Sequence, residues 1–170
     1  MKGERSMTRD ELIETIETYR ATTFRIAYGY TGSYEDSDDI TQDVFLKLYE
    51  SGKVFKDEEH KKAWLIRVTM NAAKSLLRTS WRKKRDSFEG LQNLEDRPYY
   101  DDVADRELFD CVMRLSEKYR TVVYLHYYED YSTAEIAKLL GISQTAVTTR
   151  LARARDELRR TYAKEELCYE

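Results

Sequence analysis

The pattern of apolar and polar residues predicts helices along most of the chain. Apolar side chains recur at steps of three and four residues, the spacing that places them on one face of an α-helix. Thr8 and Glu11 match the capping-box pattern that starts a helix, and Gly32 marks its end. The first helix is therefore predicted to extend to about Tyr30. Its core-facing residues are Ile16, Tyr19, Thr23, Ile26 and Tyr30.

Two more helices are predicted in the N-terminal half. Ser37 can cap the second helix, and Gly52 ends it. A charged loop over residues 53–60 leads into a third helix at about residues 61–85. These three helices are expected to pack as one bundle. The core-facing residues are Ile40, Val44 and Leu48 in the second helix and Leu65, Val68, Ala72 and Leu76 in the third.

A stretch of different composition separates the two halves. Residues 86–110 carry nine acids and two bases, and they include Gly90 and the single proline, Pro98. Such a composition is typical of a linker. We therefore expect an all-α protein of two small helical domains joined by an acidic linker. The expected boundaries are 1–85 for the N-terminal domain, 86–105 for the linker and 106–170 for the C-terminal domain.

The C-terminal half has the pattern of a helix-turn-helix. Residues 132–155 are STAEIAKLLGISQTAVTTRLARAR, in which Ser132 or Thr133 can cap the first helix and Ser143 the second. Gly141 suits the left-handed turn between them. The residues expected to be buried between the two helices are Ile136, Ala137, Leu140, Ile142 and Val147.

The second helix of this motif carries side chains that suit DNA. Gln144, Thr145, Thr148 and Thr149 lie near its N-terminal part, which enters the major groove in DNA-binding motifs of this kind. Five arginines continue along the helix and suit contacts to phosphate. They are Arg150, Arg153, Arg155, Arg159 and Arg160. The alternative, a helical hairpin with a solvated basic face, does not explain why the positional requirements of the motif are met together.

Composition narrows the class of protein. The content of 41% hydrophobic and 36% charged residues, with one proline and six glycines, is typical of a helical protein with a charged surface. The net charge of -3 argues against a uniformly basic coat that binds nucleic acid. Cys111 and Cys168 form no CxxC or Cys/His cluster, so neither a disulfide framework nor a metal site is expected. No apolar run approaches the ~18 residues of a membrane span. We expect a cytoplasmic protein without cofactor and without direct membrane insertion.

A second basic element lies in the predicted third helix. Between residues 61 and 85 there are nine bases and no acid. Six residues at steps of three or four share one face of this helix, namely Arg67, Asn71, Lys74, Arg78, Arg82 and Arg85. Such a face fits contacts to the phosphate backbone and to the bases of an opened strand. The alternative is a solvated basic helix with Trp64 and Trp81 in the core, although exposed helices usually mix charge signs.

An acidic face is expected on the second helix. Asp39, Gln42, Asp43 and Leu46 turn away from the core stripe, and a leucine among polar residues suggests a docking surface for another protein. The alternative is that these acids are present because carboxylates are favourable at the N-terminus of a helix. This alternative explains Asp39 better than Asp43. An enzyme is not expected, because the chain has two histidines, no convergent nucleophile set and no glycine-rich phosphate loop.

Three segments, in this order, resemble the extracytoplasmic-function (ECF) sigma factors of bacterial RNA polymerase. Residues 36–50, DSDDITQDVFLKLYE, are similar to the family's polymerase-docking segment. Residues 61–78, KKAWLIRVTMNAAKSLLR, are similar to its melting and recognition helix, and residues 115–158 to its C-terminal domain. The resemblance implies a non-catalytic subunit that joins core polymerase, recognises the minus-ten and minus-thirty-five promoter elements and helps to melt the DNA.

The resemblance also implies partners and residue roles. The partners are core RNA polymerase, promoter DNA and a separate anti-sigma factor. The polymerase-docking residues would be Asp39, Gln42, Asp43, Phe45 and Leu46. The minus-ten residues would be Phe55 and Lys56, in the loop where the family captures a flipped base, with Arg67, Asn71, Lys74, Arg78, Arg82 and Arg85. The minus-thirty-five residues would be Ser143, Gln144, Thr145, Thr148, Thr149, Arg150, Arg153 and Arg155.

Two other classes of function fit part of the chain. A stand-alone helix-turn-helix regulator would bind a palindromic operator as a dimer, with half-sites roughly 34–36 Å apart. It leaves the acidic face and the upstream basic helix without a role. A nucleic-acid enzyme would need metal-dependent turnover that is lost in Asp39→Ala. The promoter-specificity subunit accounts for all three features.

Overall fold

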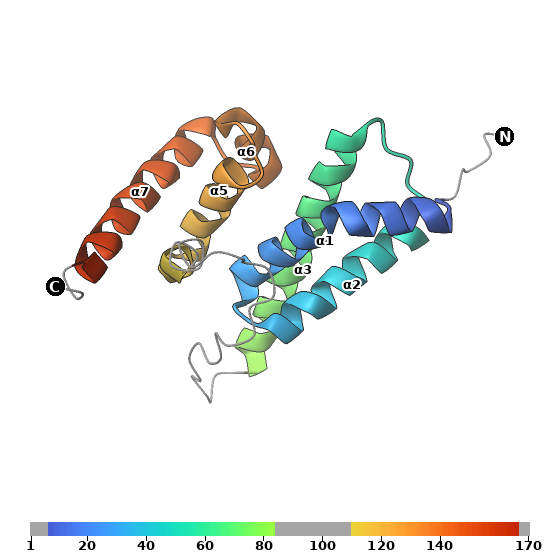
Figure 1. The fold of residues 1–170 in the computed structure, drawn as a ribbon, viewed down its shortest axis with the longest axis horizontal. Coiled ribbons are helices and arrows are strands. Elements are labelled where there is room, and N and C mark those ends of the chain that lie inside the picture. Colours follow the sequence, from blue (N-terminus) through green and yellow to red (C-terminus); the bar gives the residue numbers. More distant parts are fainter. Residues whose placement is uncertain (1–6, 84–109, 167–170) are drawn as a thin grey trace. The chain divides into compact units, whose positions relative to one another are not determined.

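The computed structural model describes residues 7–83 and 110–166, and it describes side chains over residues 7–79 and 110–161. The chain divides into two compact units, Met1–Asp96 and Arg97–Glu170, and each is considered by itself. Every regular element among the described residues is a helix, as the sequence predicts (Figure 1). The predicted linker and Arg85 lie outside the described residues. Within the described part of the chain, no helix is long and apolar enough to cross a membrane.

Helix α1, Arg9–Thr31, has the ends that the sequence predicts. Thr8 Oγ1 accepts from the Glu11 main-chain N–H, and the Glu11 carboxylate accepts from the Thr8 N–H at 2.9 Å. Gly32 ends the helix in the left-handed conformation, with φ of 63°. Because the capping signals are local, the sequence was sufficient to predict both ends.

Helix α2, Tyr34–Glu50, begins earlier than predicted. Its N-cap is Ser33, whose side chain accepts from the Asp36 N–H, and not Ser37. Ser37 is buried within the helix, and its hydroxyl donates to the Ser33 carbonyl at 2.6 Å. The reason is the turn at Gly32, which places Ser33 directly in position to cap the next helix.

Helix α3, Glu58–Lys83, begins within the predicted loop. Asp57 starts it, because its carboxylate accepts from the His60 main-chain N–H at 2.8 Å. The buried face is shifted from the predicted one: Leu65 is buried, whereas Val68, Ala72 and Leu76 are only partly buried. The buried residues are Leu65, Ile66, Thr69, Met70 and Ala73. Helix α3 packs against both α1 and α2 (Figure 1). Its buried face is therefore centred between these two neighbours.

The C-terminal unit consists of α5, Glu117–Tyr127, α6, Thr133–Leu140, and α7, Gln144–Glu166, preceded by a helical segment at residues 110–114. Helices α5 and α6 both pack against α7. The most deeply buried side chains of this unit are Val122, Leu125, Ile136, Val147 and Ala154. Of the predicted buried residues, Leu140 and Ile142 are only partly covered, and Leu139 is buried instead.

Candidate functional site

Helices α6 and α7 form the predicted helix-turn-helix. Ser132 caps α6 and forms a reciprocal capping box with Glu135. Gly141 has φ of 66° and turns the chain, and the Ile142 N–H donates to the Ala137 carbonyl at 3.1 Å. Ser143 caps α7, because its hydroxyl accepts from the Ala146 N–H at 3.1 Å. Both helices of the motif therefore start at a serine and have defined ends.

The start of α7 presents polar side chains to solvent. Gln144, Thr145, Thr148 and Thr149 are all exposed, whereas Val147 between them is completely buried. The Gln144 amide donates to Thr133 Oγ1 at 2.9 Å, and the Thr148 hydroxyl donates to the Gln144 carbonyl at 3.0 Å. The predicted polar face thus exists, and one of its residues is held by α6.

The arginines of α7 are not equivalent. Arg153 is exposed and Arg150 is partly covered. Arg155 donates to the hydroxyl of Tyr127 at 3.1 Å, so it connects α7 to the end of α5. This contact was not expected from the sequence. It gives Arg155 a structural partner in addition to its predicted contact with phosphate.

The basic face of α3 is present over its described length. We use this name for Arg67, Asn71, Lys74 and Arg78. Arg67, Asn71 and Arg78 are exposed. Lys74 is partly buried, with its Nζ 5.7 Å from the centre of the Tyr30 ring. The helix includes Arg82, but its side chain lies outside the described residues.

The loop over residues 53–57 carries an aromatic contact that the sequence did not reveal. The Phe55 ring lies edge-on to Trp64 at 5.7 Å and to His60 at 5.6 Å between centroids. Lys53 Nζ is 5.5 Å from the centre of the Trp64 ring. Lys56 is exposed. Trp64 is therefore partly covered by the loop and is not a fully buried core residue.

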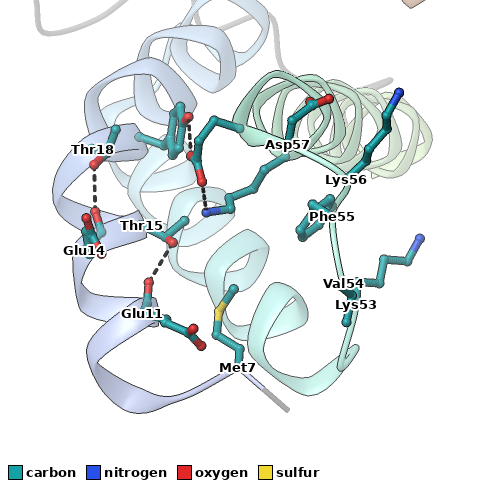
Figure 2. A pocket seen from close by; sticks show the side chains of 13 residues that line it. Met7, Glu11, Glu14, Thr15, Thr18, Lys53, Val54, Phe55, Lys56 and Asp57 are labelled. Carbon is teal, nitrogen blue, oxygen red and sulfur yellow. Dashed lines mark hydrogen bonds and ion pairs between the residues drawn. The ribbon is translucent and has the colours of Figure 1, made fainter. Parts of the chain in front are cut away.

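A cavity of about 500 Å³ lies between this loop and α1. Its walls come from the first half of α1 and from the loop, with Phe55 on one side (Figure 2). At one edge the Tyr19 hydroxyl donates to Glu58 Oε2 at 3.0 Å, and Lys61 Nζ lies 2.6 Å from Glu58 Oε1. Burial and the Glu58 carboxylate raise the pKa of Tyr19 to about 12, and the hydrogen bond from Lys61 lowers the pKa of Glu58.

The outer face of α2 forms a surface of acids, an amide and apolar groups. Asp39, Gln42, Asp43 and Leu46 are exposed, and Leu46 retains 55% of its surface. We call these four residues the docking surface, after the role that the resemblance predicts for them. The acids of the first turn are Glu35 and Asp36. The helix dipole therefore explains neither Asp39 nor Asp43, because its effect falls off within the first turn.

Phe45 is not part of the docking surface, which corrects its predicted place there. Its side chain is 5% exposed, and it follows Ser37 and Thr41 at four-residue steps on the buried side of α2. The core stripe of Ile40, Val44 and Leu48 is therefore wider than predicted. Tyr49, 44% exposed, was not predicted and lies three residues after Leu46, on the same side of the helix.

The described residues contain no group of three or more histidines, cysteines, aspartates or glutamates that could hold a metal ion. Cys111 is buried. The two units thus present three distinct surfaces: the docking surface on α2, the basic face of α3 beside the loop, and the start of α7. A helix-turn-helix with a second basic surface defines a DNA-binding protein of the helical class.

Comparison with known proteins identifies the family. The profile of Sigma-70 region 2 matches residues 15–83, and that of Sigma-70 region 4 matches residues 105–158. The RNA polymerase sigma factor NccH of Alcaligenes xylosoxydans xylosoxydans is 30% identical over 134 residues, covering 72% of this chain and 71% of NccH. The chain belongs to the RNA polymerase sigma factors, in their ECF group. Proteins of this family act in promoter-specific transcription initiation, and this chain does so as a member.

Two relatives from Bacillus subtilis (strain 168) match over most of their length. The RNA polymerase sigma factor SigV is 26% identical, with 96% of this chain and 98% of SigV covered. The ECF RNA polymerase sigma factor SigW is 28% identical, with 89% of each chain covered.

Solved structures agree on the fold. The sigma factor RpoE from Bartonella quintana, in complex with the anti-sigma factor NepR, superposes with a TM-score of 0.75 at 19% identity, covering 89% of this chain and 96% of RpoE. CnrH, in complex with the cytosolic domain of CnrY, superposes with a TM-score of 0.66 at 22% identity, covering 95% of this chain and 93% of CnrH.

Proposed function

We propose that the chain reads two promoter elements with its two units while it is attached to core RNA polymerase. The observation that carries this proposal is that each unit exposes its own DNA-compatible surface. The basic face of α3 belongs to the first unit, and the polar start of α7 to the second. Residues 1–85 and 106–170 would be the functional domains, with 86–105 as the linker between them.

The first unit would recognise and open the minus-ten element. Arg67, Lys74 and Arg78 supply positive charge along one side of α3, as contacts to the phosphates of an opened strand require. The loop with Phe55 and Lys56 would take up a base that has left the stack. Flipping a base costs a few kcal/mol, which contacts in the complete complex must offset. Support comes from the partly exposed Phe55 ring beside a cavity of about 500 Å³.

The second unit would read the minus-thirty-five element with α7. Exposed Gln144, Thr145 and Thr149 lie where a recognition helix contacts base edges. Arg150 and Arg153 follow within the next turns and would contact phosphate. Ser143 and Thr148 take part in hydrogen bonds within the helix start, so their contribution would be to shape this surface as well as to touch DNA.

The docking surface on α2 would bind core polymerase. Its residues combine negative charge with the exposed Leu46, a mixture that suits a polar interface with an apolar centre. Phe45 would contribute only by supporting this helix from the core. Asp39 and Asp43 are exposed on the outer side of α2, so both carboxylates are accessible to a basic partner.

The regulation of the chain would rest on a separate anti-sigma factor. The complexes of RpoE with the anti-sigma factor NepR and of CnrH with the cytosolic domain of CnrY, in which RpoE and CnrH have this fold, support that partner class. Sigma factors are generally non-enzymatic DNA-binding regulators. We infer that the present chain is likewise not an enzyme. We also place it in the cytoplasm, where core polymerase and promoter DNA are found.

A footprint of the holoenzyme tests the two-element proposal. Core polymerase with the full chain should protect two promoter regions from cleavage and should make the bases of the downstream region reactive to single-strand probes. Replacement of Thr149 and Arg153 by alanine should remove protection upstream only. A footprint that covers one region, or that is unaffected by these replacements, would contradict the proposal.

A further inference from the structure

One hydrogen bond joins the starts of the two helices of the helix-turn-helix. Gln144 Nε2 donates to Thr133 Oγ1 at 2.9 Å, across a separation of 11 residues. Thr133 is the first residue of α6, and Gln144 is the first residue of α7. The bond therefore fixes a residue at the start of the recognition helix to the helix that precedes it.

We infer that Thr133, which is not on the recognition helix, gives Gln144 a preference for adenine by holding its amide with one N–H on the Thr133 hydroxyl. The inference rests on the proposed function, in which the start of α7 reads the upstream promoter element. A glutamine amide has two N–H donors and one carbonyl acceptor. When one N–H is donated to Thr133, one N–H and the carbonyl oxygen are left for DNA. This pair matches the N7 acceptor and the N6 amino group of adenine in the major groove.

A second hydrogen bond holds Gln144 at the start of α7. Its main-chain carbonyl accepts from Thr148 Oγ1 at 3.0 Å. In the first turn of α6, the Glu135 carboxylate accepts from the Ser132 N–H at 2.8 Å and from the Ser132 hydroxyl at 2.7 Å. The side chain and the main chain of Gln144 are thus each held by a threonine.

The opposite orientation of the amide would have a different consequence. If the Thr133 hydroxyl donated to Gln144 Oε1, both amide N–H groups would face the groove. Two donors match the N7 and O6 acceptors of guanine instead of adenine. The identity of the preferred base therefore reports on the orientation that Thr133 imposes.

The role assigned to Thr133 is that of a positioning residue. Without the bond, the Gln144 side chain must be ordered when DNA binds, which costs affinity for the matched base more than for the other bases. We expect the adenine preference to fall roughly two- to tenfold, the range for ordering one flexible side chain. Thr133→Ser keeps the hydroxyl and should retain the preference.

The test is a competition among promoters that differ only in the upstream element. Holoenzyme is assembled from core polymerase with the full chain or with Thr133→Val, Thr133→Ser, Gln144→Ala or the Thr133→Val, Gln144→Ala double variant. Each transcribes a pool with randomised upstream bases, and the templates of the transcripts are sequenced. Thr121→Val is the matched control, because it removes a hydroxyl that donates to Glu117 O within α5.

The expected result is an adenine preference at one position that Gln144→Ala abolishes, Thr133→Val weakens at the same position and Thr133→Ser preserves. The double variant should lose no more than Gln144→Ala. An unchanged preference in Thr133→Val, a guanine preference in the parent, or no effect of Gln144→Ala would each overturn the inference. The proposed function fails separately, by the absence of any upstream preference in the parent holoenzyme.

Discussion

The hydroxyl of Tyr19 donates to the carboxylate of Glu58 at 3.0 Å, and this bond connects the middle of α1 to the first residue of α3. Glu58 also pairs with Lys61. The loop over residues 53–57 ends at this point, with the cavity between the loop and α1 beside it (Figure 2). In the proposed function this loop captures the flipped base, so Tyr19 holds one end of the capture site.

Tyr19→Phe should weaken minus-ten recognition without weakening polymerase binding. The variant keeps the ring and loses only the bond to Glu58, so the loop is less ordered before the base arrives. We expect open complexes on duplex promoters to decline several-fold, within the roughly 0.5–1.5 kcal/mol of a typical hydrogen bond. Templates already opened at the minus-ten element should be affected less. Tyr34→Phe, at an exposed tyrosine of α2, is the control. Equal activity of Tyr19→Phe and the parent on duplex DNA would rule out this role.

The same bond should make stability depend on alkaline pH. The pKa of Tyr19 is raised from 10.0 to about 12 by burial and by Glu58. Between these values the unfolded chain has lost this proton while the folded chain keeps it, so rising pH favours unfolding. The stability that the parent holds over Tyr19→Phe below pH 10 should therefore shrink toward pH 12. Thermal unfolding of both proteins across this range measures it, and a constant difference would contradict the assignment.

Asp43→Arg should weaken polymerase binding, whereas Phe45→Ala should weaken the fold. Asp43 is exposed, so reversal of its charge should reduce binding to core polymerase and leave thermal stability nearly unchanged. Phe45 is 5% exposed, so its truncation should lower the free energy of unfolding by about 3–5 kcal/mol. Glu17→Arg makes the same charge change on an exposed position of α1. Polymerase binding by Asp43→Arg at the parent level would exclude the docking surface from that role.

Arg78→Ala should change the salt dependence of promoter binding. One lost phosphate contact lowers the slope of log K against log salt by about 1. Lys74→Ala should lower the slope and also stability, because Lys74 Nζ lies 5.7 Å from the Tyr30 ring centre. Arg9→Ala, at the exposed start of α1, should change neither. Holoenzyme binding measured over a salt series gives the slopes. An unchanged slope in Arg78→Ala would show that Arg78 contacts solvent and not phosphate.

Local signals in the sequence were enough to predict part of this fold. The ends of α1 follow from Thr8, Glu11 and Gly32, and the turn of the helix-turn-helix follows from Gly141. In each case the residues that decide the conformation are within a few positions of one another. For the same reason the exposed start of α7 was predicted correctly.

Features that depend on packing between helices were not predicted. The buried face of α3 was misplaced because α3 contacts two helices at once. Phe45 was assigned to the docking surface by resemblance, whereas the width of the α2 core stripe buries it. The bonds of Tyr19 to Glu58 and of Gln144 to Thr133 join separate helices. Periodicity within one helix contains no information about such pairs.

In the proposed function, this chain directs core RNA polymerase to promoters through two DNA elements. The decisive experiment is transcription from a pool of promoters with randomised upstream and downstream elements, by core polymerase with and without the chain. Selective initiation should occur only with the chain, and two separate sequence elements should be enriched among the active templates. The proposed function is wrong if core polymerase gains no selectivity, or if the chain alone binds a palindromic site tightly as a dimer.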